Sequence, residues 1–312
     1  MYIRKYKCKK GGLIILINTD KILNNHRLIY AHKDDERVET LIEHSQKVIE
    51  TFYQLDKEKK IRKKLRDLME NMNIEDREGS KIQLKGESKS LIEKMFVNAI
   101  YMHDWGKVNP KYQVEKMSNH KVKELVGIAG LNDSHSPLSA AIYIDSFYEA
   151  TREVLNPVER VFLQLVLFAF AFVIYSHHGD MGDFSEWVKE LNYSNRILSL
   201  KQKSAYGFFL YEKLKLKAKP ERLMFFIDRG EINYNGYMFY FMMKLLQSSI
   251  NLCDFVATGS FYSENSYELN NIIDIDGIKK RFQESSIYKS IKDYEEKKGP
   301  KVEGINKYRN QM

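Results

Sequence analysis

The chain has 312 residues, 43% of them apolar and 29% charged, which is the composition of a soluble globular protein with a sizeable core. Only 5 prolines and 16 glycines favour long helices over a loop-rich all-β fold. A net charge of +8 suits a polyanionic partner such as nucleic acid, although many basic proteins bind none.

Neither a disulfide framework nor a membrane segment is indicated. The two cysteines, Cys8 and Cys253, form no CxxC pair, which fits a reducing cytoplasm. The apolar run after the basic N-terminus is too short for a signal-peptide core. The run 161–175 falls short of the ~18 to 20 apolar residues that cross a bilayer. We therefore expect a buried central helix, no membrane contact and a cytoplasmic protein.

The first part of the chain predicts a small β-rich segment, a buried helix and a charged stretch. Residues 1–30 contain a strand-like apolar run without an evident function. A helix begins near Asp35, and its buried face carries Val38 and His44. Residues 56–88 are strongly charged and predict an exposed helix followed by a loop. This is most simply a solvated face, with contact to nucleic-acid phosphates as the alternative.

The next helix ends in the stretch YMHDWGK, residues 101–107. His103 continues the apolar stripe of that helix and therefore points inward. Asp104 lies about 100° further round, and Gly106 supplies the flexible residue that usually ends a helix. An imidazole and a carboxylate at one buried point suit a divalent transition metal. The alternative is a helix-end histidine whose ring pairs with the neighbouring carboxylate.

Three later segments repeat this pattern of polar residues at helix ends or on buried faces. His135-Ser136-Pro137 opens a helix, with capping as the alternative role of His135. A very apolar helix starts at Pro157 and ends in His177-His178-Gly179, which puts two adjacent ligand candidates at a helix terminus. A last helix, from about 237 to 258, carries Asp254 on its apolar side. A lone carboxylate there costs several kcal/mol unless it is paired or bound to a metal.

Seven polar residues are thus predicted to be buried or to lie at helix ends: His44, His103, Asp104, His135, His177, His178 and Asp254. The other histidines, His26, His32 and His120, fall in predicted loops. Two metal ions need about this many ligands if one carboxylate bridges them and positions stay open for water and substrate.

The order of these motifs resembles the HD-type nuclease of type I CRISPR systems, which acts with a DNA helicase that is fused to it or supplied as a separate chain. The matching motifs are Tyr30-Ala31-His32 with Glu43-His44, then His103-Asp104-Trp105-Gly106-Lys107, His135-Ser136, His177-His178-Gly179 and the helix around Asp254. They span about 30–260, most of the chain. The resemblance implies an all-α, HD-superfamily helical bundle, here with a small β-rich N-terminal segment.

The same resemblance implies a domain division and a set of site residues. Residues 1–262 would form the nuclease domain, with 56–88 as a charged insertion, and 263–312 a polar tail similar to the segment that leads to the helicase in fused members. One ion would be held by His44, His103, Asp104 and Asp254, and a second by Asp104, His135, His177 and His178. Lys107 matches the family's lysine and would neutralise the phosphate in the transition state. Alternatively, Lys107 is an ordinary exposed lysine.

The implied activity is metal-dependent hydrolysis of DNA by an endo- or exonuclease that prefers single strands. It would serve antiviral defence together with a helicase and an RNA-guided surveillance complex. The ligands suit Mn, Ni, Co or Fe, and such mixed sets also bind Mg. No GxxxxGK[ST] phosphate loop occurs, so we expect the helicase motor outside this sequence.

Two alternatives to a nuclease stay open. One is an HD-superfamily phosphohydrolase of nucleotides or cyclic dinucleotides, although the GYP element of the cyclic dinucleotide enzymes is missing after His178. The other is an inactive nucleic-acid-binding scaffold.

Overall fold

The structure, a computed structural model, describes residues 3–5, 15–127, 133–179 and 232–263, with short pieces at 182–184, 187, 218 and 229–230 and a few positions between 280 and 293. The predicted polar tail 263–312 lies largely outside these residues. Met1–Asn265 form one compact unit and Ser266–Met312 a second. The elements named below all belong to the first unit.

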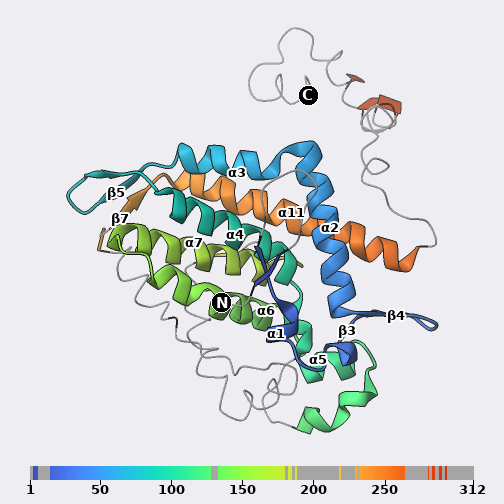
Figure 1. Cartoon of the computed structure of the whole chain (residues 1–312). Helices are drawn as coiled ribbons and strands as arrows, with labels where there is room; N and C mark the ends of the chain where they lie inside the picture. The colour runs from blue at the N-terminus through green and yellow to red at the C-terminus, as the bar shows by residue number, and fades with distance from the viewer. Residues whose placement is uncertain are drawn as a thin grey trace. The chain divides into compact units, whose positions relative to one another are not determined.

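Long helices form most of this unit, which confirms the predicted all-α class. They are α2 (Leu41–Lys59), α3 (Ile61–Glu70), α4 (Gly86–Met102), α6 (Ser136–Arg152), α7 (Pro157–Tyr175) and α11 (Gly236–Tyr262). In Figure 1, α3, α11, α4, α7 and α6 lie side by side, and neighbours in this row contact one another. Helix α2 packs against α4 and α11.

Helix α7 is the most buried helix of the bundle. The side chain of Asn156 caps it by accepting hydrogen bonds from the N–H groups of Val158 and Glu159, and Pro157 fits its first turn. Its 19 residues make it longer than the run 161–175 suggested and long enough to cross a bilayer. However, 72% of its most apolar window is buried inside the protein, because α4, α6 and α11 pack around it. This burial is typical of a core helix.

Short strands and helices connect the bundle. Strands β1 (Ile3–Lys5) and β2 (Ile15–Ile17) pair antiparallel and confirm the small β-rich start, and β3 (Tyr30–Lys33) and β4 (Val38–Thr40) form a hairpin. The short helices are α1 (Thr19–Ile22), η1 (His26–Leu28), η2 (Trp105–Val108), α5 (Pro110–Glu115) and η3 (His120–Gly127). His26 and His120 therefore begin short 3-10 helices.

Helix α2 begins six residues later than predicted. Thr40 caps it in a reciprocal capping box with Glu43, and the preceding residues form β4. Val38, expected on the buried helix face, lies in that strand and is 43% exposed. The carboxylate of Asp34 accepts the N–H groups of Glu36 and Arg37, which turns the chain into the hairpin before a helix can form.

The charged stretch 56–88 is more ordered than a helix followed by a loop. Strands β5 (Ile74–Asp76) and β6 (Lys81–Ile82) form a hairpin in it, and β7 (Ile232–Tyr234) pairs with β5 on the other side. Helix α3 turns its apolar residues Leu65 and Met69 inward and contacts α4 and α11. The stretch is thus part of the folded unit.

Candidate metal centre

The structure brings all seven predicted ligand candidates together from five helices and their ends. Two overlapping groups form, one of His44, His103, Asp104 and Asp254, and one of Asp104, His135, His177 and His178. In each group, one ligand atom per residue lies within 4.8 Å of the others. These are the two groups that the resemblance implied, and Asp104 belongs to both.

Helix ends position His103 and His177. Nδ1 of His103 lies 2.9 Å from the carbonyl oxygen of Ile100, and Nδ1 of His177 lies 2.6 Å from that of Ile174. His103 follows α4 directly and His177 follows α7 after Ser176, so each pairs with a carbonyl that the last turn leaves without a partner. With Nδ1 as the donor, Nε2 of both rings keeps its lone pair and faces the cluster.

Asp104 is 1% exposed and offers its two oxygens to different neighbours. Oδ1 lies 3.1 Å from Nε2 of His135 and 3.4 Å from Nε2 of His177. Oδ2 lies 3.4 Å from Nε2 of His44 and 3.7 Å from Nε2 of His103. One carboxylate therefore faces both ligand groups.

The two outer members of the cluster are the more accessible ones. Asp254, on α11, has a side chain that is 22% exposed, and its Oδ1 lies 3.1 Å from Nε2 of His44 and 3.6 Å from Nε2 of His103. His178 is exposed, and its Nε2 lies 3.1 Å from Nε2 of His135. A substrate could therefore approach the cluster from the His178 side or from the Asp254 side.

Lys107 is buried, which contradicts the alternative of an ordinary exposed lysine. Its Nζ lies 2.8 Å from Oδ2 of Asp104 and donates to the carbonyl oxygen of Ala31 at 3.1 Å. Burial alone would lower the pKa of this amine, but the Asp104 carboxylate outweighs it and raises the pKa. The ammonium charge of Lys107 is therefore part of the centre.

Gly106 serves a different purpose from the one predicted. Helix α4 already ends at Met102, and Gly106 lies inside η2. A Cβ atom on it would stand 1.8 Å from the carbonyl oxygen of His135 and 2.5 Å from the amide nitrogen of Ser139. Glycine is needed because the start of α6 packs directly against η2 at this point.

Two residues beside His44 were not predicted to belong to the site. Glu39 is buried, and its Oε2 lies 2.8 Å from Nδ1 of His32 and 3.3 Å from Nδ1 of His44. His32, expected in a loop, lies on β3, and its ring packs edge-on against that of His44 at 4.7 Å. The motif Tyr30-Ala31-His32 was a signal for His32, whereas nothing in the sequence singled out Glu39, which was expected within the helix beginning near Asp35.

The charges divide the cluster into two halves. Partial desolvation lowers the pKa of His178 to about 4, and the neighbouring His177 acts in the same direction. Burial also lowers the pKa of His135, against the effect of Asp104. For His44, burial is outweighed by Asp104 and Asp254, which raise the pKa to about 10. Without a cation, His44 is therefore protonated, while His135 and His178 are neutral and ready to coordinate.

The buried atoms of the cluster fit a cation. In the part of the chain that the structure describes, Nε2 of His44, His103 and His177 and Oδ1 of Asp104 are buried without a hydrogen-bond partner. Their mutual distances are short, but the groups are not aligned as hydrogen bonds. Buried polar atoms without partners are costly and rare. Four such atoms in one cluster, each of which offers a lone pair once its group is deprotonated, suit a divalent metal.

Comparison with known families matches residues 30–205 to the model described as Cas3, HD domain. The matched range includes the ligand candidates from His44 to His178 and ends before Asp254. No curated protein and no solved structure matches the chain. The family is one of hydrolases with nuclease activity, and HD domains bind divalent metals. Because the family model covers more than half of the sequence, the chain belongs to the family of Cas3 HD domains.

Proposed function

We propose that this chain is a nuclease that hydrolyses DNA phosphodiester bonds with two divalent cations and prefers single strands. The observation that carries this proposal is the position of Asp104, whose two oxygens face two separate groups of histidines. A carboxylate shared in this way is the usual bridge of a two-metal hydrolase. When bound, such a pair of cations activates a water and stabilises the attacking and leaving oxygens of the phosphate.

The proposed ligands are His44, His103, Asp104 and Asp254 for one cation, and Asp104, His135, His177 and His178 for the other. The nitrogen-rich sets favour Mn, Ni, Co or Fe, and Mg also suits a set with two carboxylates. Because Asp104 belongs to both sets, it would keep the two cations close enough to act on one phosphate.

We assign Lys107 to the same machinery as a positioning residue. Its ammonium contacts Asp104 and the Ala31 carbonyl, so it fixes the carboxylate between the two ligand groups. It also adds a buried positive charge near the phosphate that would bind there. These contacts favour fixation of Asp104 over direct contact between Lys107 and the substrate.

Glu39 and His32 would orient the His44 ring through its Nδ1 edge, which faces away from Asp104. A metal-bound histidine commonly donates its second ring N–H to a carboxylate, which fixes the ring and raises its basicity. Glu39 lies 3.3 Å from Nδ1 of His44 on the side away from Asp104, and His32 holds the same oxygen at 2.8 Å. Lys47 contacts the other oxygen at 2.6 Å.

The substrate and the partners are inferred from charge and family. A net charge of +8 supports binding to the phosphate backbone in a manner that weakens with salt. A flexible single strand reaches a centre between helix ends more readily than a rigid duplex does. We expect a helicase domain or subunit to supply that strand, an RNA-guided surveillance complex to select it, and residues 263–312 to lead toward the helicase. The setting would be antiviral defence in the cytoplasm.

The test is a cleavage assay on the purified chain with Mn, Ni, Co, Fe, Mg or Zn. Circular single-stranded DNA, duplex DNA, nucleotides and cyclic dinucleotides serve as substrates. We expect cleavage of the circular single strand, and its loss in Asp104→Ala but not in Asp67→Ala, a matched change at an exposed position of α3. Hydrolysis of nucleotides alone would indicate a small-molecule phosphohydrolase. Bound metal without any hydrolysis would indicate a scaffold.

A further inference from the structure

A cavity of about 470 Å³ lies beside the candidate metal centre, between the end of α7, the start of α6 and residues 182–187. Three aromatic side chains line it, those of Phe172, Tyr175 and Trp187. The ring centre of Trp187 lies 5.4 Å from that of Phe172 and 5.9 Å from that of Tyr175. The cavity has the size of a small-molecule site, about 300 to 1,000 Å³.

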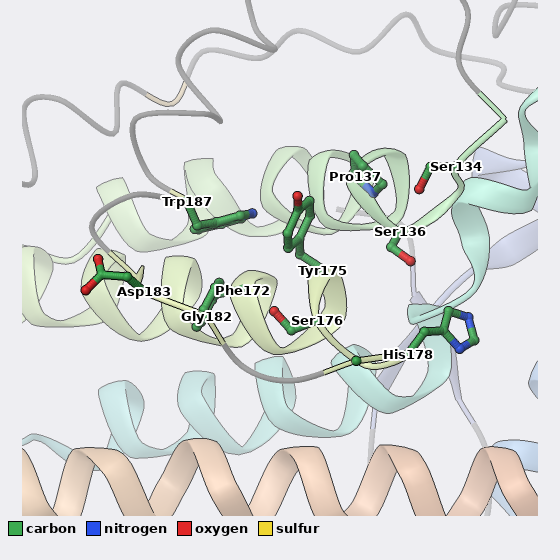
Figure 2. Close-up of a pocket in the computed structure, with 11 residues that line it drawn as sticks. Ser134, Ser136, Pro137, Phe172, Tyr175, Ser176, His178, Gly182, Asp183 and Trp187 are labelled. Atoms are coloured by element: carbon green, nitrogen blue, oxygen red, sulfur yellow. The ribbon is translucent and has the colours of Figure 1, made fainter.

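The cavity is continuous with the proposed metal ligands through His178. This residue lines the cavity and also belongs to the group with Asp104, His135 and His177. Figure 2 shows His178 at one end and Asp183 at the other, with the Tyr175 and Trp187 rings between them. A phosphate held near His178 would therefore have its own nucleoside within reach of the aromatic wall.

The side chains at the two ends of the cavity set the orientation of a bound nucleotide. Asp183 is the one side chain with a formal negative charge among the lining residues that the structure describes, so this end repels a phosphate. Aromatic side chains stack on any nucleobase, because every base has a flat π-face. A carboxylate also accepts N–H groups of cytosine, as in base recognition in general. The base would thus point toward Asp183 and the phosphate toward His178.

We propose that this cavity is a base-binding subsite for the nucleotide next to the phosphate that is cut. The proposal rests on the proposed nuclease function, because that function supplies the phosphate beside His178. It adds a specific position for one base, held by stacking against Tyr175, the partly exposed ring of the lining, which the buried rings of Phe172 and Trp187 support from below.

The first test measures binding without cleavage. A fluorescent phosphorothioate oligodeoxycytidylate, which resists hydrolysis, is titrated with the Mn-loaded full chain and followed by anisotropy. Loss of the ring in Tyr175→Ala should weaken binding about tenfold, whereas Tyr175→Phe keeps the ring and should bind as the wild type does. Tyr240→Ala is the matched control, since Tyr240 is exposed on α11 and does not line the cavity. Thermal unfolding checks that each variant is folded.

Unchanged binding by Tyr175→Ala would overturn the subsite, as would an equal loss in Tyr175→Phe or in Tyr240→Ala. A second test needs no variant: single abasic positions are moved along a cleavable strand. The wild type should cut less at one bond, which lies at a fixed distance along the strand from the missing base. Equal cleavage at every bond would also overturn the proposal. If no DNA is cut at all, the nuclease function fails, and the binding test still decides about the cavity.

Discussion

Replacement of Gly106 by alanine tests whether the close packing of η2 against α6 sets the geometry of the centre. The new Cβ would stand 1.8 Å from the His135 carbonyl oxygen, while ordinary contact begins near 3.4 Å. The two backbones would have to separate by about 1.6 Å, because neither atom belongs to a flexible side chain. His135, the first residue to move, carries the ring that lies 3.1 Å from Asp104.

The expected loss of stability follows from this clash. Overpacking of a tight contact costs about 1 to 3 kcal/mol, and a backbone clash belongs at the upper end of that range. The hydrogen bond from the Gly106 N–H to Oγ of Ser139, 2.8 Å long, would also be broken, for about 1 kcal/mol more. A total of about 3 to 4 kcal/mol lowers the melting temperature of a domain of this size by roughly 6 to 16 °C.

The same change should weaken one metal group more than the other. His135 belongs to the group of Asp104, His177 and His178 only, so we expect one tight cation and a second bound at least tenfold more weakly than in the wild type. Calorimetry with Mn²⁺ and thermal unfolding give the two readouts. Gly86→Ala is the matched control, because a Cβ there meets nothing within 4 Å. A Gly106→Ala chain that melts like the wild type and binds both cations equally well would refute the close packing.

The charges around His44 and Asp104 give three more expectations. Glu39→Gln removes the charge behind His44 and should lower Mn²⁺ affinity about 10- to 100-fold in calorimetry, whereas Glu50→Gln on the exposed side of α2 should not. Lys107→Met leaves the buried Asp104 carboxylate without its ammonium partner, and denaturation of the metal-free chain should show a loss of about 3 kcal/mol. The pKa of His44 is raised from 6.5 to about 10, so the protonated ring stabilises the folded, metal-free chain. This stabilisation is complete below pH 6.5 and is lost as the pH rises through about 10. Because coordination needs the neutral ring, Mn²⁺ binding near neutral pH should release protons, and equal heats in buffers of different ionisation enthalpy would argue against this shift.

Local signals in the sequence were sufficient for the helices that carry the ligands. Proline at the starts of α6 and α7, and apolar spacing along α4, predicted where these helices begin or end. His103 and Asp104 then followed from their place at the helix end. The five ligand candidates at helix ends were readable because helix ends have local rules, whereas His44 and Asp254, which lie inside α2 and α11, followed from the apolar faces that carry them.

The features that were not predicted depend on contacts between distant parts of the chain. Lys107 is buried because it reaches the carbonyl of Ala31, and Gly106 is needed because of the approach of α6. The hairpin of β5 and β6 is completed by β7, which lies more than 150 residues later. Glu39 was missed because its stretch was predicted to be helical, and three-residue strands such as β4 give no periodic pattern. Each case needs the fold before the residue can be interpreted.

These distant contacts explain why one short stretch holds so much of the site. His103 and Asp104 offer ligand atoms, Trp105 is fully buried against Tyr101, Gly106 admits α6, and Lys107 fixes Asp104. The five consecutive residues thus perform four different physical tasks, and the short turn from His103 into η2 brings them to different neighbours. A substitution at Gly106 should therefore affect the centre through His135, although Gly106 has no side chain to contribute a ligand. The spacing of the stretch, and not the His103-Asp104 pair alone, carries the information for a centre with two groups of ligands.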